Sequence, residues 1–502
     1  MKLLSKNSYF LLLAVCLFFL TLIFNPFGVN ANATKVLAVG LLMITLWITE
    51  ALPMPVVALI PIVLFPLMGV CKADEAAAPY ANTVVFLFMG GFMIGLAIEK
   101  WHLHKRIALN IVNLTGTSGN RIILGFILAT GFLSMWLSNT ATTMMMYPIA
   151  MSVVHVLEQN HKGSGNIKNI AICLLLAIAY SSNFGGIATI IGTPPNVAFV
   201  GFLEKKYHYT FQFLQWMLLC TPIAFLLMFC LYWIMTRWLF KNNLKKDEST
   251  STIIKHELQQ MGKLSSPEKR VLIIFIITAL LWITKDLINT DRFQAIIRFY
   301  NFSDANIPKA FFKLDDTMIA VFGAILMFLV PAKSLVPETK FLLEWHDTQK
   351  MAWGILLLFG GGISLANQLE KAGLIQQLGS FIAAYAGTNL LLLVFVVTLV
   401  SIFISEIMSN VAQVIVFAPV VAGIADALHI NPLFLGIPMT LGASCAGMLP
   451  MGTPPNAIVF ASGRLKLSDM LKAGFVMNII ATILITLFSY YLLPIITNPI
   501  LK

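Results

Sequence analysis

The chain carries the same polar motifs twice within strongly apolar sequence. Ser138-Asn139-Thr140 recurs 271 residues later as Ser409-Asn410-Val411. Gly192-Thr193-Pro194-Pro195-Asn196 recurs 260 residues later as Gly452-Thr453-Pro454-Pro455-Asn456. Ser134 and Ser405 also stand 271 residues apart, each four residues before its Ser-Asn motif. Because self-similarity at a fixed spacing indicates a repeat architecture, the sequence predicts two copies of one structural unit.

The composition places the chain in a lipid bilayer. Of its 502 residues, 58% are hydrophobic and only 11% are charged, which is typical of a membrane protein with many spans. The net charge of +11 does not indicate a nucleic-acid partner, because the basic residues cluster at the ends of apolar runs, as they do in cytoplasmic loops. The six cysteines show no CxxC spacing, so no zinc or iron site is expected.

Apolar runs of about 20 residues predict membrane-spanning helices. The fold class expected is therefore an all-α polytopic membrane protein with about eleven transmembrane helices. The predicted spans are 9–26, 34–51, 54–70, 82–99, 167–202, 212–239, 270–289, 316–331, 351–369, 433–461 and 471–494.

Two further apolar segments, near 122–156 and 390–427, hold the Ser-Asn motifs. Each is too long for one plain helix and has polar residues near its middle. Irregular backbone at membrane depth survives only where protein or a water-filled cavity covers it. We therefore expect two re-entrant hairpins, at about 121–157 and 388–428.

The positions of the basic stretches predict the orientation. With the N-terminus in the cytoplasm, eleven crossings place the basic loops there and the C-terminus outside, in the inner (plasma) membrane. The first hairpin then enters from the cytoplasm and the second from the outside. The two repeats are therefore expected to be inverted.

This topology divides the chain into four parts. Residues 1–33 form the first transmembrane helix, for which a signal peptide ending near Ala33 is the alternative. Residues 34–240 form the first inverted repeat, 241–268 a solvated cytoplasmic linker, and 269–502 the second repeat.

The repeated motifs predict two cation sites. Proline cannot continue a helix but suits the first position of a new one, so Pro194 and Pro454 mark broken helices with free carbonyl groups before them. Oxygen ligands without a fixed charge suit Na⁺. The first predicted site consists of Ser134, Ser138, Asn139 and Gly192, and the second of Ser405, Ser409, Asn410 and Gly452.

The remaining polar groups of the same motifs are expected to bind an anionic substrate. Amide groups, hydroxyl groups and helix N-termini are suited to a carboxylate. The predicted substrate contacts are Asn139, Thr140, Thr193, Asn410, Thr453 and, as the asymmetric position, Val411. No Lys or Arg lies between Ala372 and Gly463, and the first hairpin has only Arg121 at its edge. Bound cations and dipoles must then balance the substrate charge, which favours obligatory coupling.

Several features have a purely structural interpretation as well. A lone Ser-Asn pair in a membrane helix more often makes a packing hydrogen bond, but the matched repeat favours ligands here. Gly90-Gly91 and Gly360-Gly361-Gly362 are typical of close helix packing. Glu406, an intramembrane carboxylate, is either a proton carrier or a buried structural acid.

At these residues the chain resembles the divalent anion:sodium symporter family, the dicarboxylate, citrate and sulfate carriers. The resemblance covers nearly the whole chain. Its motifs are Ile48-Thr49-Glu50-Ala51-Leu52-Pro53, the paired Ser-Asn signatures, Ser405-Glu406 and both Gly-Thr-Pro-Pro-Asn elements. It implies a homodimer with a fixed scaffold domain and a moving transport domain, elevator-type alternating access, and the Na⁺ and substrate residues named above. Val411 departs from the threonine found in several dicarboxylate carriers.

The predicted function is a secondary active transporter that imports C4 dicarboxylates such as succinate, malate or fumarate with Na⁺. The alternatives within the class are citrate or sulfate symport and Na⁺-independent dicarboxylate exchange. An enzyme such as a lipid-linked transferase would need clustered acids, for which Asp315-Asp316 is the candidate pair. Broken helices from opposite sides favour alternating access over a channel.

Overall fold

The computed structural model describes residues 6–26, 28–116, 118–160, 165–242, 248–290, 313–333, 340–386 and 389–497. Within these ranges every regular element is a helix, apart from one isolated bridge between Pro331 and Phe341. The predicted all-α class is therefore confirmed.

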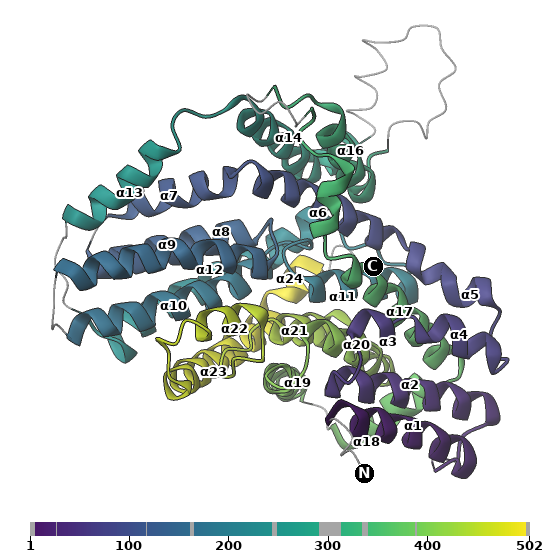
Figure 1. The fold of residues 1–502 in the computed structure, drawn as a ribbon. Coiled ribbons are helices and arrows are strands. Elements are labelled where there is room, and N and C mark those ends of the chain that lie inside the picture. The colour runs from purple at the N-terminus through teal and green to yellow at the C-terminus, as the bar shows by residue number, and fades with distance from the viewer. Residues whose placement is uncertain are drawn as a thin grey trace, which may run out of the picture.

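The first half of the chain forms long helices, with several helices of one or two turns among them (Figure 1). These helices are α1 (Lys6–Phe24), α2 (Ala31–Thr49), α3 (Met54–Val57), α4 (Ile60–Leu67), α5 (Ala73–Ala77), η1 (Ala78–Ala81), α6 (Thr83–Lys100), α7 (Leu103–Thr115), α8 (Gly119–Ser134), α9 (Asn139–Asn160), α10 (Gly165–Gly186), α11 (Pro194–Tyr207), α12 (Phe213–Ile234) and η2 (Met235–Leu239).

The second half follows a similar order. Its helices are α13 (Glu248–Gln260), α14 (Ser266–Ile288), α16 (Asp316–Leu329), η3 (Trp345–Lys350), α17 (Trp353–Lys371), α18 (Leu374–Ala386), α19 (Leu390–Ser405), α20 (Asn410–Ala427), α21 (Leu433–Ala443), α22 (Pro454–Phe460), α23 (Leu467–Tyr491) and α24 (Leu493–Thr497).

Eight helical segments in the described part of the chain are long and apolar enough to cross a membrane. Several of the eleven predicted spans are shorter or interrupted. The span 54–70 is divided into α3 and α4, and 167–202 and 433–461 are each broken before a proline pair. Proline removes a backbone donor and so ends or divides a helix, which explains these interruptions.

The helix bounds repeat with the motifs. Both ends of α18 lie 271 residues after those of α7, and the same holds for α19 and α8. None of the predicted spans or hairpins covers α7 or α18. In α7 the buried residues Leu103, Ala108, Leu109 and Val112 fall at helical spacing, a periodic signal that could have identified it.

The interior is built around α10. Figure 1 shows α7, α8, α9, α10 and α12 running side by side, and α10 packs against α8, α9, α12 and α22. The run from Ile170 to Tyr180 is buried on all sides. A helix that is apolar all round belongs in such a core.

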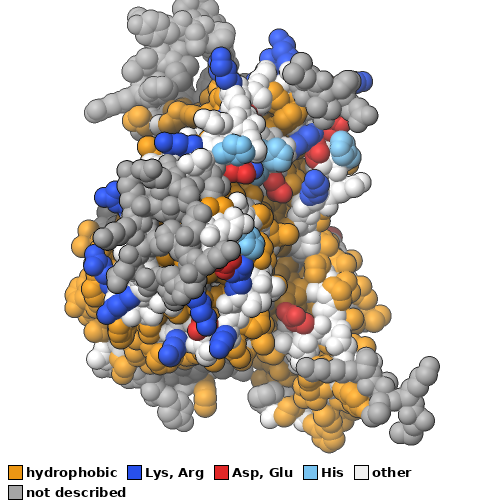
Figure 2. Space-filling model, turned by 60° about the vertical axis from the view of Figure 1, so that its left-hand side comes forward, with side chains coloured by type: hydrophobic (Ala, Val, Ile, Leu, Met, Phe, Trp, Pro, Cys, Tyr) orange, Lys and Arg blue, Asp and Glu red, His pale blue; other side chains and the backbone are white. Residues whose placement is uncertain are grey.

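The surface is suited to lipid. Large apolar side chains are exposed on helices in both halves, including Ile23 and Phe229 in the first and Phe322 and Leu329 in the second. Figure 2 shows one face on which hydrophobic side chains form broad areas, with histidine side chains mainly in the upper half and Lys and Arg side chains also along the lower left. Exposed apolar area of this extent marks a membrane surface.

Two glycines from the paired glycine motifs allow close helix contacts. A Cβ atom added at Gly90 would lie 2.7 Å from the backbone of Ala320, and one added at Gly361 would lie 2.2 Å from the carbonyl oxygen of Ala58. These separations are too short for any side chain. The packing interpretation of these glycines therefore agrees with the structure.

Part of the linker between the two repeats is helical and packs against α7. Lys105 Nζ lies 2.8 Å from Glu257 Oε2 of α13, and Arg106 Nη1 donates to the carbonyl oxygen of Gly262 at 2.9 Å. Arg106 Nε also lies 2.9 Å from Glu268 Oε1. Residues 243–247 of the linker lie outside the described residues.

A buried ion pair joins α14 to α16, and its carboxylate also contacts α12. Lys285 Nζ lies 2.7 Å from Asp316 Oδ2, with side-chain exposures of 6% and 8%. Asp316 Oδ2 also accepts from the backbone N–H of Phe213 at 3.0 Å. Asp315 instead caps α16 by accepting from Thr317 N and Met318 N. Both acids of the pair considered for an enzyme therefore have structural partners.

We expect Asp316→Asn to destabilise the protein by about 3 kcal/mol or more, because it leaves the Lys285 ammonium buried without a counter-ion. The measurement is thermal unfolding of the purified protein in detergent. Asp315→Asn is the matched control, since asparagine caps a helix as well as aspartate does. Equal stability of the two variants would contradict the assignment of Asp316 as the counter-ion that stabilises buried Lys285.

Candidate functional site

Each Ser-Asn motif lies in a tight turn between two helices. The chain leaves α8 at Ser134 and enters α9 at Asn139, and it leaves α19 at Ser405 and enters α20 at Asn410. Ser138 Oγ accepts from the backbone N–H of Ala141 at 3.2 Å, so this hydroxyl caps α9. The turns thus bring hydroxyl and amide groups to helix N-termini, where backbone donors lack partners within the helix.

The first predicted cation site is assembled around Asn139. Ser134 Oγ donates to Asn139 Oδ1 at 2.8 Å. A Cβ atom at Gly186 would lie 2.3 Å from Asn139 Oδ1, and one at Gly192 would lie 3.0 Å from the carbonyl oxygen of Ser134. Ser134, Asn139 and Gly192 therefore share one small volume, and only glycine fits beside the asparagine.

The second predicted cation site has the same central contact. Ser405 Oγ donates to Asn410 Oδ1 at 2.7 Å and also approaches the carbonyl oxygen of Ala443. A Cβ atom at Gly452 would lie 2.9 Å from Glu406 Oε2. The structure thus brings Ser405 and Asn410 together and places Gly452 beside the neighbouring carboxylate.

Asn183 links the two repeats and is a site residue that the sequence motifs do not predict. Asn139 Nδ2 donates to Asn183 Oδ1 at 3.4 Å and lies 3.5 Å from Thr193 Oγ1. Asn183 Nδ2 donates to Thr453 Oγ1 at 3.2 Å. The buried side chains of Asn183, Thr193 and Thr453 therefore form a polar bridge from the first cation site to the second broken helix. The repeat-equivalent position of Asn183 is Ala443, so the repeat gave no signal for it.

The asparagine at the end of each Gly-Thr-Pro-Pro-Asn element holds a broken helix. Asn196 Nδ2 donates to the carbonyl oxygens of Gly186 at 3.2 Å and Thr189 at 2.8 Å. Asn456 Nδ2 donates to those of Ala446 at 3.2 Å and Leu449 at 3.1 Å. These carbonyls correspond at the same 260-residue offset as the motifs. The motif was recognised from sequence, but this role required the structure.

The remaining predicted residues lie at the same turns, and no side-chain contact between them and the residues above is described. Thr140, Ser409 and Val411 are half-buried at the starts of α9 and α20. Among the described residues, no group of three or more His, Cys, Asp or Glu side chains is arranged to hold a metal ion. The polar centre therefore consists of hydroxyl, amide and backbone groups, with the Glu406 carboxylate beside Gly452.

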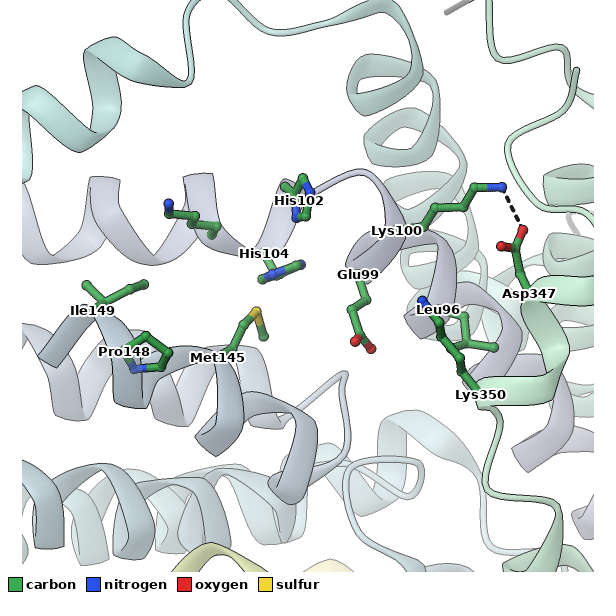
Figure 3. A pocket seen from close by; sticks show the side chains of 11 residues that line it. Leu96, Glu99, Lys100, His102, His104, Met145, Pro148, Ile149, Asp347 and Lys350 are labelled. Carbon is green, nitrogen blue, oxygen red and sulfur yellow. Dashed lines mark hydrogen bonds and ion pairs between the residues drawn. The ribbon is translucent and has the colours of Figure 1, made fainter. Parts of the chain in front are cut away.

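A cavity of about 600 Å³ lies between α6, α7, α9 and η3. Figure 3 shows Glu99, His104 and Met145 around it, with the Lys100–Asp347 ion pair at one side. Burial lowers the pKa of His104 to about 4, so its neutral ring donates through Nδ1 to the carbonyl oxygen of Ile98 at 3.0 Å. Met145 lies six residues after Asn139 on α9, about 9 Å along the helix. On α9 the lining of the cavity therefore begins almost two helical turns after Asn139.

Comparison with known proteins identifies the family. The model of the sodium:sulfate symporter transmembrane region matches residues 4–497. The sodium-dependent dicarboxylate transporter SdcS of Staphylococcus saprophyticus is 38% identical over 491 residues, 96% of this chain and 91% of that protein. SdcS of Staphylococcus aureus strain USA300 is 37% identical, over 97% of this chain and 91% of that protein.

Solved structures share the fold at low identity. Neisseria gonorrhoeae MtrF, described as illuminating a class of antimetabolite efflux pumps, aligns with a TM-score of 0.56 and 12% identity over 98% of this chain and 95% of that one. The Alcanivorax borkumensis YdaH transporter aligns with a TM-score of 0.50 and 12% identity over 84% and 86%. The resemblance drawn from the repeated motifs is confirmed by the family match: the chain belongs to the sodium:sulfate symporter family and is a membrane transporter, not an enzyme.

Proposed function

We propose that this protein imports C4 dicarboxylates such as succinate, malate and fumarate together with Na⁺. The observation that carries the proposal is the pair of matched contacts, Ser134–Asn139 at 2.8 Å and Ser405–Asn410 at 2.7 Å, each at a helical turn beside a broken helix. The names of the SdcS relatives, which cover nearly the whole chain, support both the ion and the substrate class.

The matched contacts support two Na⁺ sites. Each combines a serine hydroxyl, an asparagine amide oxygen and nearby backbone carbonyl groups, which are neutral oxygen donors of the kind that discontinuous membrane helices offer to Na⁺. The first site is Ser134, Ser138, Asn139 and Gly192, and the second is Ser405, Ser409, Asn410 and Gly452. The ion is cargo here, carried with the substrate.

The bridge between the sites supports substrate binding there. Thr193 and Thr453 precede the prolines that start α11 and α22, so a carboxylate beside them faces helix N-termini, which favour negative charge. Asn139, Thr140, Asn410 and Val411 complete the proposed contacts. Because the second hairpin carries no Lys or Arg, bound Na⁺ must supply the positive charge, and transport becomes coupled to it.

Family membership supports the remaining features that we propose. These are a homodimer in the inner (plasma) membrane, inverted repeats, a cytoplasmic N-terminus and an external C-terminus, and an elevator movement of a transport domain that holds both hairpins. In this orientation the cavity beside α9 opens on the cytoplasmic side and serves as the route by which substrate leaves.

The proposal is tested by radiolabelled succinate uptake into liposomes that contain the purified protein. We expect uptake to require an inward Na⁺ gradient. Uptake that needs internal succinate but no Na⁺ would make the protein an exchanger and overturn the symport proposal. Competition by unlabelled citrate or sulfate, but not by malate or fumarate, would show that the protein is a citrate or sulfate symporter instead.

We expect Asn139→Ala and Asn410→Ala each to reduce Na⁺-driven uptake to the level of empty liposomes, because each removes an oxygen ligand and an amide donor from a buried site. Asn110→Ala on the exposed part of α7 is the matched control and should transport normally. Size-exclusion chromatography checks that all three variants remain assembled. Normal uptake by both site variants would refute the site assignment.

We expect Val411→Thr to change the relative uptake rates of succinate, malate and fumarate, because it adds a hydroxyl group at the asymmetric position of the second motif. A buried hydroxyl that finds a substrate partner discriminates strongly between related molecules. The measurement is uptake of each labelled substrate at a fixed Na⁺ gradient. An unchanged profile would make Val411 a packing residue.

A further inference from the structure

Glu406 is a buried carboxylate that accepts four hydrogen bonds. Its side chain lies in the turn between α19 and α20 and is 4% exposed. Oε1 accepts from the backbone N–H groups of Gly447 and Met448, both at 2.8 Å, and from Asn478 Nδ2 at 2.7 Å. Oε2 accepts from the backbone N–H of Leu449 at 2.9 Å. Hydrogen bonds to an ionised group are among the strongest in proteins.

These contacts hold the unwound segment between α21 and α22. Its carbonyl groups are also satisfied: Asn456 contacts those of Ala446 and Leu449, and Tyr180 Oη donates to that of Gly447 at 2.7 Å. Buried backbone groups outside a helix require such partners. Glu406 supplies the acceptors for three consecutive N–H groups of the segment, so its carboxylate determines where the segment lies.

The first repeat joins the corresponding positions with donor and acceptor exchanged: the loop side chain donates and the turn accepts. Met135 stands where Glu406 does, and Thr189 stands where Leu449 does. Here Thr189 donates its hydroxyl to the carbonyl oxygen of Met135 and accepts from the backbone N–H of Gly192 at 3.0 Å. Both repeats therefore tie the hairpin turn to the unwound segment, but only the second does so with a charged group.

The carboxylate adjoins the second proposed Na⁺ site. Glu406 follows Ser405 in the chain, and a Cβ atom at Gly452 would lie 2.9 Å from its Oε2. Three N–H donors and one amide already surround both oxygens, so the carboxylate is positioned to orient the backbone of the site. The structural interpretation that the sequence left open for this acid is the one that these contacts favour.

We propose that Glu406 is a positioning residue for the second Na⁺ site. It fixes the segment 447–449 against the hairpin turn, so the carbonyl and hydroxyl ligands around Asn410 are preorganised for the cation. The first site is preorganised by Thr189 instead, and the two sites respond differently to loss of this acid. The proposal rests on the proposed Na⁺-coupled function.

The test is Glu406→Gln, whose amide offers one oxygen acceptor and presents a donor toward another N–H group. We expect the Na⁺ concentration for half-maximal succinate uptake to rise about tenfold, with uptake recovering at saturating Na⁺. The Na⁺ concentration needed for half-maximal thermal stabilisation of the purified protein should rise in parallel. Asn478→Ala, which removes one of the four donors, should produce a smaller shift in the same direction.

Glu204→Gln is the matched control, because this glutamate accepts from Thr83 Oγ1 at 2.9 Å near the end of α11, about 15 Å along the helix from Pro194. Its Na⁺ dependence should equal that of the unaltered protein. An unaltered protein that shows no Na⁺ dependence would reject the proposed function itself. If both Glu406→Gln and Asn478→Ala show normal Na⁺ dependence, the proposed role of Glu406 is overturned while the proposed function stands. If Glu406→Gln does not fold, normal Na⁺ dependence in Asn478→Ala leads to the same conclusion.

Discussion

The fold depends on satisfying backbone groups where helices are broken inside apolar surroundings. Each such N–H or C=O group without a partner costs several kcal/mol, so a broken helix persists only where protein groups replace the missing helical hydrogen bonds. Asn196 and Asn456 do this at equivalent carbonyl groups in the two repeats. Because these two side chains keep the breaks open, the helix N-termini at Pro194 and Pro454 remain available to other groups. The chemistry of the centre follows from that constraint.

The centre belongs to both halves of the chain at once. Asn183 of α10 reaches Thr453, and Tyr180 of the same helix reaches the carbonyl oxygen of Gly447. Arg464 Nη2 lies 3.2 Å from Glu158 Oε2, which ties the loop after α22 to the end of α9. These contacts join residues more than 260 positions apart. A repeat that stood alone would leave Asn183 Nδ2 and Tyr180 Oη without these acceptors, so the two copies together build one polar centre around both motifs.

The two copies are alike in their hydroxyl–amide pairs and differ in how they are supported. In the first, the Thr189 hydroxyl donates to the carbonyl oxygen of Met135. In the second, the Glu406 carboxylate accepts hydrogen bonds from the N–H groups of residues 447–449. Similar geometry is thus reached with a neutral hydroxyl in one half and a buried charge in the other. Under the proposed function, this makes the two Na⁺ sites unequal although their direct ligands match.

The sequence by itself determined the membrane class, the duplication, the turns at Asn139 and Asn410 and the helix breaks before Pro194 and Pro454, because hydropathy, spacing and proline chemistry are local properties. It also contained the residues that pair in each site, Ser134 with Asn139 and Ser405 with Asn410. Only the tertiary structure decided that Asn183 bridges the halves, that Glu406 holds residues 447–449 and that Asp316 pairs with Lys285. These partners are far apart in the chain, and Asn183 and Glu406 have no counterpart in the other repeat. Pairing at such separation depends on how helices pack, which neither local pattern nor the repeat offset encodes.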